Sequence, residues 1–185
     1  MKHAMQNTPP QQTGKGADDG GHRRIHSPAL RVADCLASGF YIGRVRPAPG
    51  TWGTALACVL MFAAFRLFPA LNSLSGTVII ALGVTAVGII ASHTLFKAEF
   101  YGTGQKDPQT IVIDEFAGFA VTCVGGLAGA HSYLLAFALF RIFDIKKPYP
   151  VCRLELLPGG FDIVLDDVAA GIYALICRLF IEALL

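Results

Sequence analysis

Charged side chains are scarce in this sequence. They make up 15% of the 185 residues, whereas a soluble domain usually carries about 25%. Hydrophobic residues make up 54% of the chain, and the mean hydropathy is +0.54. This composition favours a membrane protein, or a helical protein that is unusually buried, over an ordinary soluble domain.

The sequence also lacks the marks of several common function classes. Its net charge is only +2, and it has no arginine-rich stripe and no zinc-finger spacing, so nucleic acid is not an expected partner. The five cysteines are scattered without a CxxC pair, which favours reduced thiols over a disulfide framework. None of them begins the C-x5-R loop that a cysteine-based phosphatase requires.

Residues 1–29 differ in composition from the rest of the chain. They are rich in Gln, Gly, Pro and charged residues, and such a segment cannot bury enough apolar surface to fold. They also lack the apolar stretch of a secretory signal peptide. We therefore predict a disordered tail over 1–29 and a single helical domain over 30–185.

Apolar residues recur at helical spacing through the domain, and no strand-like alternation persists. These patterns predict an all-α fold, a compact bundle of about six helices that is embedded in a membrane or associated with one. Two of the helices are long enough to cross, or nearly cross, a bilayer core of ~30 Å. The helices are expected at 30–41, 54–68 and 77–97, in two short pieces of 116–140, and at 164–185.

The uncharged stretch 116–140 resembles a single transmembrane helix, but its glycines argue against one. Gly125, Gly126 and Gly129 lie in its middle, where each glycine weakens a straight helix by about 1 kcal/mol. A break at these glycines gives two short helices, and neither alone crosses ~30 Å. We therefore predict a re-entrant or buried hairpin.

Carboxylates are concentrated in three short windows beside apolar helices. Six of the 13 acidic residues lie in the windows VIDEF, FRIFDIKKPYP and GGFDIVLDDVAAG. Carboxylates brought together at low dielectric repel each other strongly, and a hard divalent cation removes the repulsion. Mg²⁺ takes oxygen ligands and often binds through one or two carboxylates and a substrate phosphate. The predicted metal ligands are Asp114, Glu115, Asp166 and Asp167.

Basic residues and a glycine-rich segment suggest an anion beside the metal. Arg141 offers a planar fork for phosphate oxygens and Lys147 a point charge. The segment GRVRPAPGTWGT at 43–54 is predicted to be a loop that leads into a helix, and free N–H groups at a helix N-terminus suit a phosphate. The predicted phosphate-binding residues in this loop are Gly50, Thr51, Gly53 and Thr54.

Other interpretations of these windows remain open. Asp114 with Glu115, and Asp166 with Asp167, could simply complement the dipoles at helix N-termini, and PGTWGT could be a capped loop. A non-enzymatic transporter or scaffold with buried ion-binding carboxylates is the alternative outside the enzymes. A CDP-alcohol phosphotransferase also uses clustered aspartates, but its D-G-x2-A-R array is missing.

The windows occur in an order that resembles the phosphatidylglycerophosphatase A family. The shared patterns are GxxPxxPGTxGT, IVIDExxG, FRxFDIxKPxP and GGxxIxxDDxxAG, and the resemblance runs from about Leu36 to Leu184. It implies a Mg²⁺-dependent phosphatase of bacterial phospholipid synthesis that hydrolyses phosphatidylglycerophosphate to phosphatidylglycerol. Its phospholipid substrate would lie in the membrane. Arg141, Asp144 and Lys147 would be catalytic, with Asp144 acting as a base or as a nucleophile.

If the three acidic windows bind one ion, the path of the chain relative to the membrane is restricted. Asp114, Asp144 and Asp166 can converge on one ion only if the chain returns to the side that it left, which a break near Gly125–Gly129 allows. Basic residues near the site then lie on the same side, and the positive-inside bias makes that side cytoplasmic. The expected location is the bacterial cytoplasmic (inner) membrane, with the active site facing the cytoplasm.

Overall fold

Six α-helices are present in the computed structural model over the residues that it describes, which are 27–101, 109–149, 151 and 161–184. No strand occurs in these ranges, so the predicted all-α bundle is confirmed. Two short 3-10 helices, η1 (Ile42–Arg44) and η2 (Pro69–Asn72), lie between longer ones. The α-helices are α2 (Pro28–Ala37), α3 (Pro49–Leu67), α4 (Leu74–Lys97), α5 (Ile113–Thr122), α6 (Ala130–Lys146) and α7 (Phe161–Leu184).

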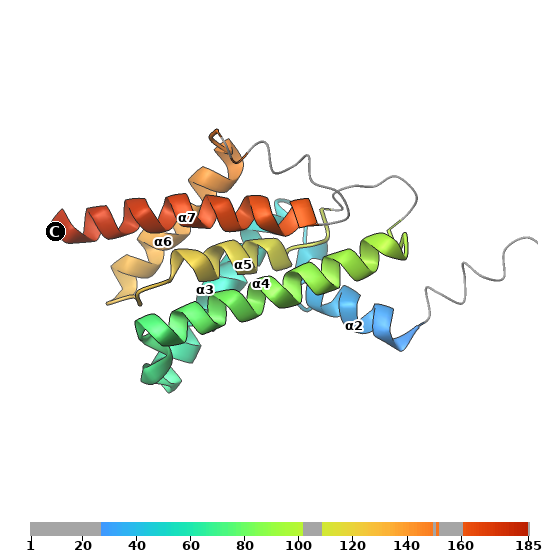
Figure 1. The fold of residues 1–185 in the computed structure, drawn as a ribbon, viewed down its shortest axis with the longest axis horizontal. Helices are drawn as coiled ribbons and strands as arrows, with labels where there is room; N and C mark the ends of the chain where they lie inside the picture. Colours follow the sequence, from blue (N-terminus) through green and yellow to red (C-terminus); the bar gives the residue numbers. More distant parts are fainter. Residues whose placement is uncertain (1–26, 102–108, 150, 152–160, 185) are drawn as a thin grey trace, which may run out of the picture.

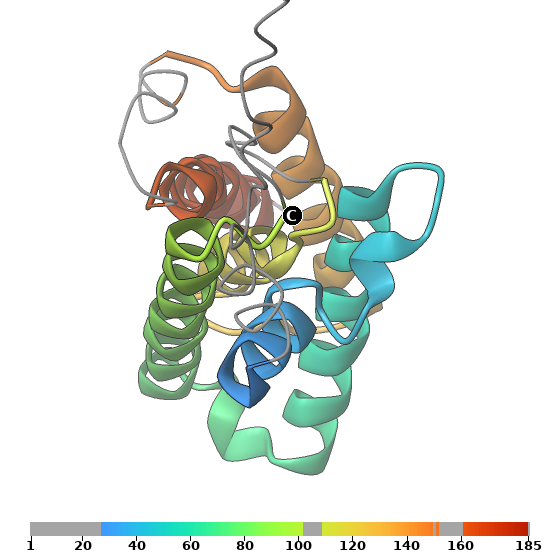
Figure 2. The same cartoon turned by 90° about the vertical axis from the view of Figure 1, so that its right-hand side faces the viewer.

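The short helix α5 is the centre of the bundle. It contacts each of the other five α-helices, and it lies in the middle of them when the molecule is viewed along its length (Figure 2). Six of its ten residues are buried, and Ala117 and Phe119 are completely inaccessible. Residues at the start of α5 are therefore surrounded by neighbouring helices, which is a precondition for an enclosed site.

Glycines bring α5 and α7 unusually close together. The two helices run side by side in the same direction (Figure 1). A Cβ atom on Gly118 would collide with the carbonyl oxygen of Asp167, and one on Gly171 would collide with the carbonyl oxygen of Gly118. This close approach sets the spacing between the first turn of α5 and the acidic residues of α7.

The chain breaks between α5 and α6, as the glycines predicted. Helix α5 ends at Thr122 and α6 begins at Ala130. Gly125 and Gly126 have φ angles of +91° and +86°, in the left-handed region that costs a residue with a side chain energy. The stretch 116–140 is therefore a helical hairpin, and both of its ends contribute to one side of the molecule.

Side chains from η2 and α4 bind the backbone of this break. Asn72 donates to the carbonyl of Leu127 at 3.0 Å and accepts from its N–H at 2.9 Å. The Thr77 hydroxyl accepts from the N–H of Gly125 at 3.1 Å. Irregular backbone at membrane depth is tolerated only when its polar groups find partners inside the protein, and these contacts supply them.

Arg178 of α7 makes the largest contribution to the break. Its side chain is 1% exposed. Its Nε donates to the carbonyl of Thr122 at 3.0 Å, Nη1 to that of Gly126 at 3.1 Å and Nη2 to that of Val124 at 2.7 Å. Nη1 also pairs with Glu182 at 2.6 Å. One guanidinium group thus caps the end of α5, where helical carbonyls have no intrahelical partner.

Helix boundaries differ from the prediction at two places that matter. Helix α3 begins at Pro49, so PGTWGT forms its first turns and is not a loop. The residue before it, Ala48, has a φ of 59° and turns the chain sharply into the helix, and Pro49 has the φ that a first helical residue needs. Helix α2 begins at Pro28, inside the segment predicted as a tail. Residues 1–26 of that segment lie outside the described residues.

Among the residues that the structure describes, two helices are long and apolar enough to cross a membrane. They are α3 and α4, which are joined through η2. In the most apolar 18-residue window of each helix, 22% of the residues are buried inside the protein. Both helices also expose several large apolar side chains, among them Phe62 on α3 and Ile79 on α4. By length and composition these two helices are the candidates for membrane contact, as the sequence predicted.

Candidate active site

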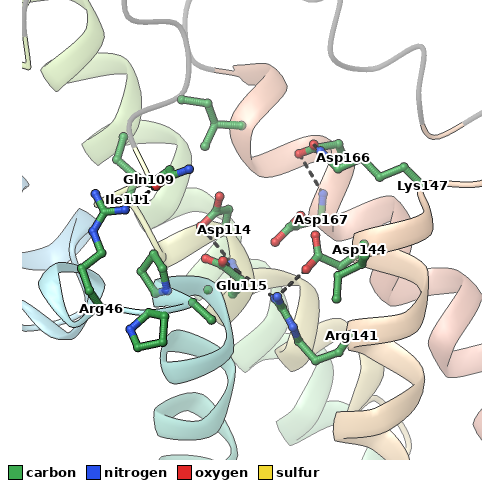
Figure 3. A pocket seen from close by; sticks show the side chains of 16 residues that line it. Arg46, Gln109, Ile111, Asp114, Glu115, Arg141, Asp144, Lys147, Asp166 and Asp167 are labelled. Carbon is green, nitrogen blue, oxygen red and sulfur yellow. Dashed lines mark hydrogen bonds and ion pairs between the residues drawn. The ribbon is translucent and has the colours of Figure 1, made fainter.

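The starts of α3, α5 and α7 and the end of α6 surround one polar pocket. Its volume is about 620 Å³. Eight of its described lining residues are charged, and they project into it from different elements (Figure 3). Carboxylates from all three sequence windows meet here, although Asp114 and Asp144 are separated by the broken stretch. These lining residues are Asp114, Glu115, Asp144, Asp166, Asp167, Arg46, Arg141 and Lys147.

Three of the carboxylates form a compact acidic group. One oxygen atom from each of Asp114, Glu115 and Asp167 lies within 4.8 Å of the other two. Asp114 Oδ1 accepts the backbone N–H of Glu115 at 3.0 Å, which fixes its orientation. Glu115 Oε2 and Asp167 Oδ2 are buried without a hydrogen-bond partner in the described part of the chain. The donor set is oxygen only, so the group can bind a hard metal ion.

Burial disfavours the charged state of this group when no cation is bound. Burial raises the pKa of the Glu115 carboxyl, and the negative charge of Asp144 adds to the effect. The pKa of Asp167 is raised well above its usual value by burial and then by the charges of Asp144, Glu115 and Asp166. A bound cation would reverse both effects, because it favours ionised carboxylates.

Arg141 and Asp144 form an ion pair on the last turns of α6. Arg141 Nη1 lies 2.5 Å from Asp144 Oδ2 and 3.9 Å from Glu115 Oε1. Their side chains are mostly buried, with exposures of 16% for Arg141 and 14% for Asp144. Arg141 Nε is buried and has no hydrogen-bond partner among the described residues. The guanidinium group therefore carries a donor that an anion in the pocket could use.

Lys147 and Asp166 form a second ion pair on the same side of the pocket as Arg141 (Figure 3). Lys147 Nζ lies 2.5 Å from Asp166 Oδ2. Lys147 directly follows α6 and has a φ of 39°, and this left-handed turn directs the chain away from the helix. Asp166 was predicted as a metal ligand, but the structure places its carboxylate against Lys147 and outside the compact group of three.

Gly50 borders the pocket for a steric reason. A Cβ atom at this position would collide with Glu115 Oε1 and would lie 3.3 Å from Arg141 Nη1. The absence of a side chain lets the first turn of α3 approach both charged groups. Gly50 was predicted as a phosphate-binding residue, and it is the only one of the four such residues that lines the pocket in the described part of the chain.

The other three residues that were predicted to bind phosphate make contacts within the protein. Gly53 packs against Val112, where an added Cβ would lie 2.8 Å from the Val112 Cβ. Thr54 is buried, donates to the Gly50 carbonyl at 2.9 Å and accepts a long hydrogen bond of 3.4 Å from Arg141 Nη1. Thr51 lies in the first turn of α3, with its backbone N–H donated to Ala48. The motif therefore shapes the wall of the pocket.

The sequence placed Arg46 among the basic residues near the site, but sequence reasoning missed Gln109 and the pairing of these two residues in the pocket. Arg46 precedes α3 and Gln109 precedes α5, and Arg46 Nη1 donates to Gln109 Oε1 at 2.6 Å. A further link ties α2 to the same end of the molecule, because Asp34 accepts from Arg44 at 2.7 Å and from the Tyr101 hydroxyl at 2.5 Å. The partners in these pairs lie up to 67 residues apart in the sequence, and no local motif predicts that they pair.

Comparison with known proteins agrees with the geometry. The sequence model of the phosphatidylglycerophosphatase A family matches residues 35–182. A phosphatidylglycerophosphatase A from Haemophilus influenzae is 38% identical over 149 residues, which cover 80% of this chain and 86% of the relative. One from Escherichia coli is 29% identical over 160 residues, covering 82% and 86%.

A third relative has a different name. A protein of Bacteroides thetaiotaomicron, provisionally named a phosphatidylinositol-3-phosphatase, is 35% identical over 144 residues, which cover 76% of this chain and 87% of the relative. No solved structure is significantly similar to the chain. The family match covers all four shared sequence patterns and nearly all of the helices that carry them, and so this chain is a phosphatase that belongs to the phosphatidylglycerophosphatase A family.

Proposed function

We propose that this protein hydrolyses the terminal phosphomonoester of phosphatidylglycerophosphate, giving phosphatidylglycerol and phosphate, and that the reaction depends on Mg²⁺. The observation that carries the proposal is the convergence of Asp114, Glu115 and Asp167 within 4.8 Å, next to the Arg141–Asp144 pair. The names of two relatives supply the substrate. The family match does not support the alternative hypothesis, in which the protein is a non-enzymatic transporter or scaffold.

The residues present fit a magnesium ion. Glu115 Oε2 and Asp167 Oδ2 are buried oxygens without a partner among the described residues, and Asp114 completes an all-oxygen donor set. We propose these three as the metal ligands, with Asp166 holding Lys147 in place. When bound, Mg²⁺ supplies Lewis-acid stabilisation of the phosphoryl oxygens.

Residues of the pocket would bind the phosphate, stabilise its developing charge and accept a proton. Arg141 Nε, the buried donor without a partner, would bind a phosphoryl oxygen, and Lys147 would add positive charge where negative charge develops. Asp144 is fixed at the pocket by Arg141 and would take the proton of the attacking water. Gly50 lets the first turn of α3 approach Glu115 and Arg141 closely.

A phosphate-release assay tests the proposal. The purified chain in detergent micelles should release phosphate from phosphatidylglycerophosphate in Mg²⁺. Treatment with EDTA should abolish release, and added Mg²⁺ should restore it. Release that persists after exhaustive chelation would contradict the metal requirement. Activity on phosphatidylinositol 3-phosphate without activity on phosphatidylglycerophosphate would contradict the proposed substrate.

We also propose that the protein lies in the bacterial inner membrane with its pocket at the cytoplasmic face. Arg46 and Lys147 line the pocket, and three further described basic residues end helical elements, namely Arg44 in η1, Lys97 in α4 and Lys146 in α6. The end of α4 lies toward the same end of the bundle as the start of α5 (Figure 1). The positive-inside bias then favours the cytoplasm for that end.

Thiol labelling at the two ends of α4 measures this orientation. Single cysteines replace Ser75 or Lys97, both exposed, in a cysteine-free background. In intact cells an impermeant reagent should label position 75 and leave position 97 unlabelled until the cells are opened. Labelling of position 97 but not position 75 in intact cells would reverse the orientation, and equal labelling would argue against a spanning α4.

A further inference from the structure

Three described cations line the pocket, and they differ in how their charge is balanced. Arg141 is paired with Asp144, and Lys147 with Asp166, each at 2.5 Å. Arg46 instead donates to the neutral side-chain amide of Gln109 at 2.6 Å. Arg46 is thus the one lining cation of the described pocket whose side chain is held by an uncharged group. Its positive charge stays available to an anionic ligand.

Arg46 lies at the opposite edge of the pocket from Lys147. Figure 3 shows Arg46 and Gln109 on one side, the acidic group between, and Arg141, Lys147 and Asp166 on the other. Arg46 is exposed, so it lies at the rim, where a ligand enters. A ligand that reaches the acidic group and still contacts Arg46 needs two separated anionic groups.

We infer that Arg46 binds the phosphodiester of the lipid substrate and thereby selects lipids that carry two phosphates. This inference rests on the proposed function. In such lipids one phosphate is the terminal monoester that is hydrolysed, and the other is the diester that joins the headgroup to the diacylglycerol. With the monoester beside Arg141, the diester would lie toward the rim. The substrate class is a lipid with a phosphorylated polyol headgroup, as opposed to phosphatidic acid, which has the monoester alone.

Gln109 acts as the positioning residue for Arg46. A neutral amide can orient the guanidinium group by accepting its hydrogen bond while leaving its net charge unbalanced. A carboxylate at position 109 would accept the same bond and neutralise the charge. The pair therefore predicts that a single-atom change in Gln109 can mimic the loss of Arg46.

The test compares two lipids in the same detergent micelles with Mg²⁺. For each variant, kcat/KM is measured for phosphatidylglycerophosphate and for phosphatidic acid, and their ratio is the readout. Arg46→Gln should lower the ratio about tenfold, mainly through a higher KM, because a charge-assisted hydrogen bond is lost. Gln109→Glu should lower the ratio in the same direction. Arg66→Gln, an exposed charge at the other end of α3, should leave it at the wild-type value.

The outcomes separate the inference from the function on which it rests. A wild-type ratio in Arg46→Gln, or equal losses on both lipids, would overturn the inference while leaving the proposed function intact. A wild-type protein that hydrolyses no lipid with two phosphates would overturn both. If phosphatidylinositol 3-phosphate is the better substrate, the proposed substrate fails, and the same ratio measured on that lipid decides the role of Arg46.

Discussion

Asp167→Asn is expected to lower kcat for phosphate release by about a thousandfold, because the Lewis-acid contribution of a bound metal is worth several kcal/mol. The substitution keeps the shape of the side chain and removes one charge from the acidic group. Asp167 lies 4% exposed among other carboxylates, so the metal-free protein should fold at least as well without that charge. Asp167→Asn should therefore lower kcat without lowering the stability of the metal-free protein.

Thermal unfolding with and without Mg²⁺ separates these effects. Mg²⁺ should raise the Tm of EDTA-treated wild-type protein by binding the folded state, and it should leave the Tm of Asp167→Asn unchanged. Asp162→Asn is a matched control, because Asp162 lies in the first turn of the same helix and does not line the pocket. Near-normal turnover by Asp167→Asn in saturating Mg²⁺ would remove Asp167 from the metal ligands.

Arg178→Met is expected to lower the free energy of unfolding by about 3–5 kcal/mol, the cost of removing one partner from a buried ion pair and its hydrogen bonds. Methionine keeps much of the apolar stem and removes every donor. The carbonyls of Thr122, Val124 and Gly126 would each lose a hydrogen bond. Denaturant titration in mixed micelles measures the loss.

Glu182→Gln is the control for the ion pair alone. Glutamine at position 182 keeps an oxygen that can accept from Arg178 Nη1, and Arg178 keeps its three carbonyl partners. The loss should therefore be clearly smaller than in Arg178→Met. A large loss in Arg178→Met with a small one in Glu182→Gln would assign the stability to the capped carbonyls. Wild-type stability in Arg178→Met would show that the break is held by Asn72 and Thr77 without the arginine.

The sequence allowed much of this arrangement to be predicted, because glycine and charge patterns act locally. Gly125 and Gly126 predicted a helix break within an apolar stretch that hydropathy alone would assign to one transmembrane helix. The carboxylates of the three windows were expected to meet because they would otherwise lie charged in apolar surroundings, and the pocket lining agrees with that expectation.

The remaining details depend on contacts between distant residues. That Asp166 pairs with Lys147, and that Gly50 makes room for Glu115, depends on how helices pack, and neither follows from spacing along the chain. In the sequence alone, Arg178 is simply a charged residue near the end of an apolar helix. Its three carbonyl partners lie more than 50 residues away, so only the folded structure identifies them.

Helix α7 has a consequence for biosynthesis. It supplies Asp167 to the acidic group and Arg178 to the helix break, and these sites lie toward opposite ends of the molecule (Figure 1). Arg178 is made 56 residues after Thr122. A nascent chain that has reached only α6 contains the glycine break without the arginine that caps it. The ribosome must therefore complete most of α7 before the hairpin and the metal-binding group can both become stable.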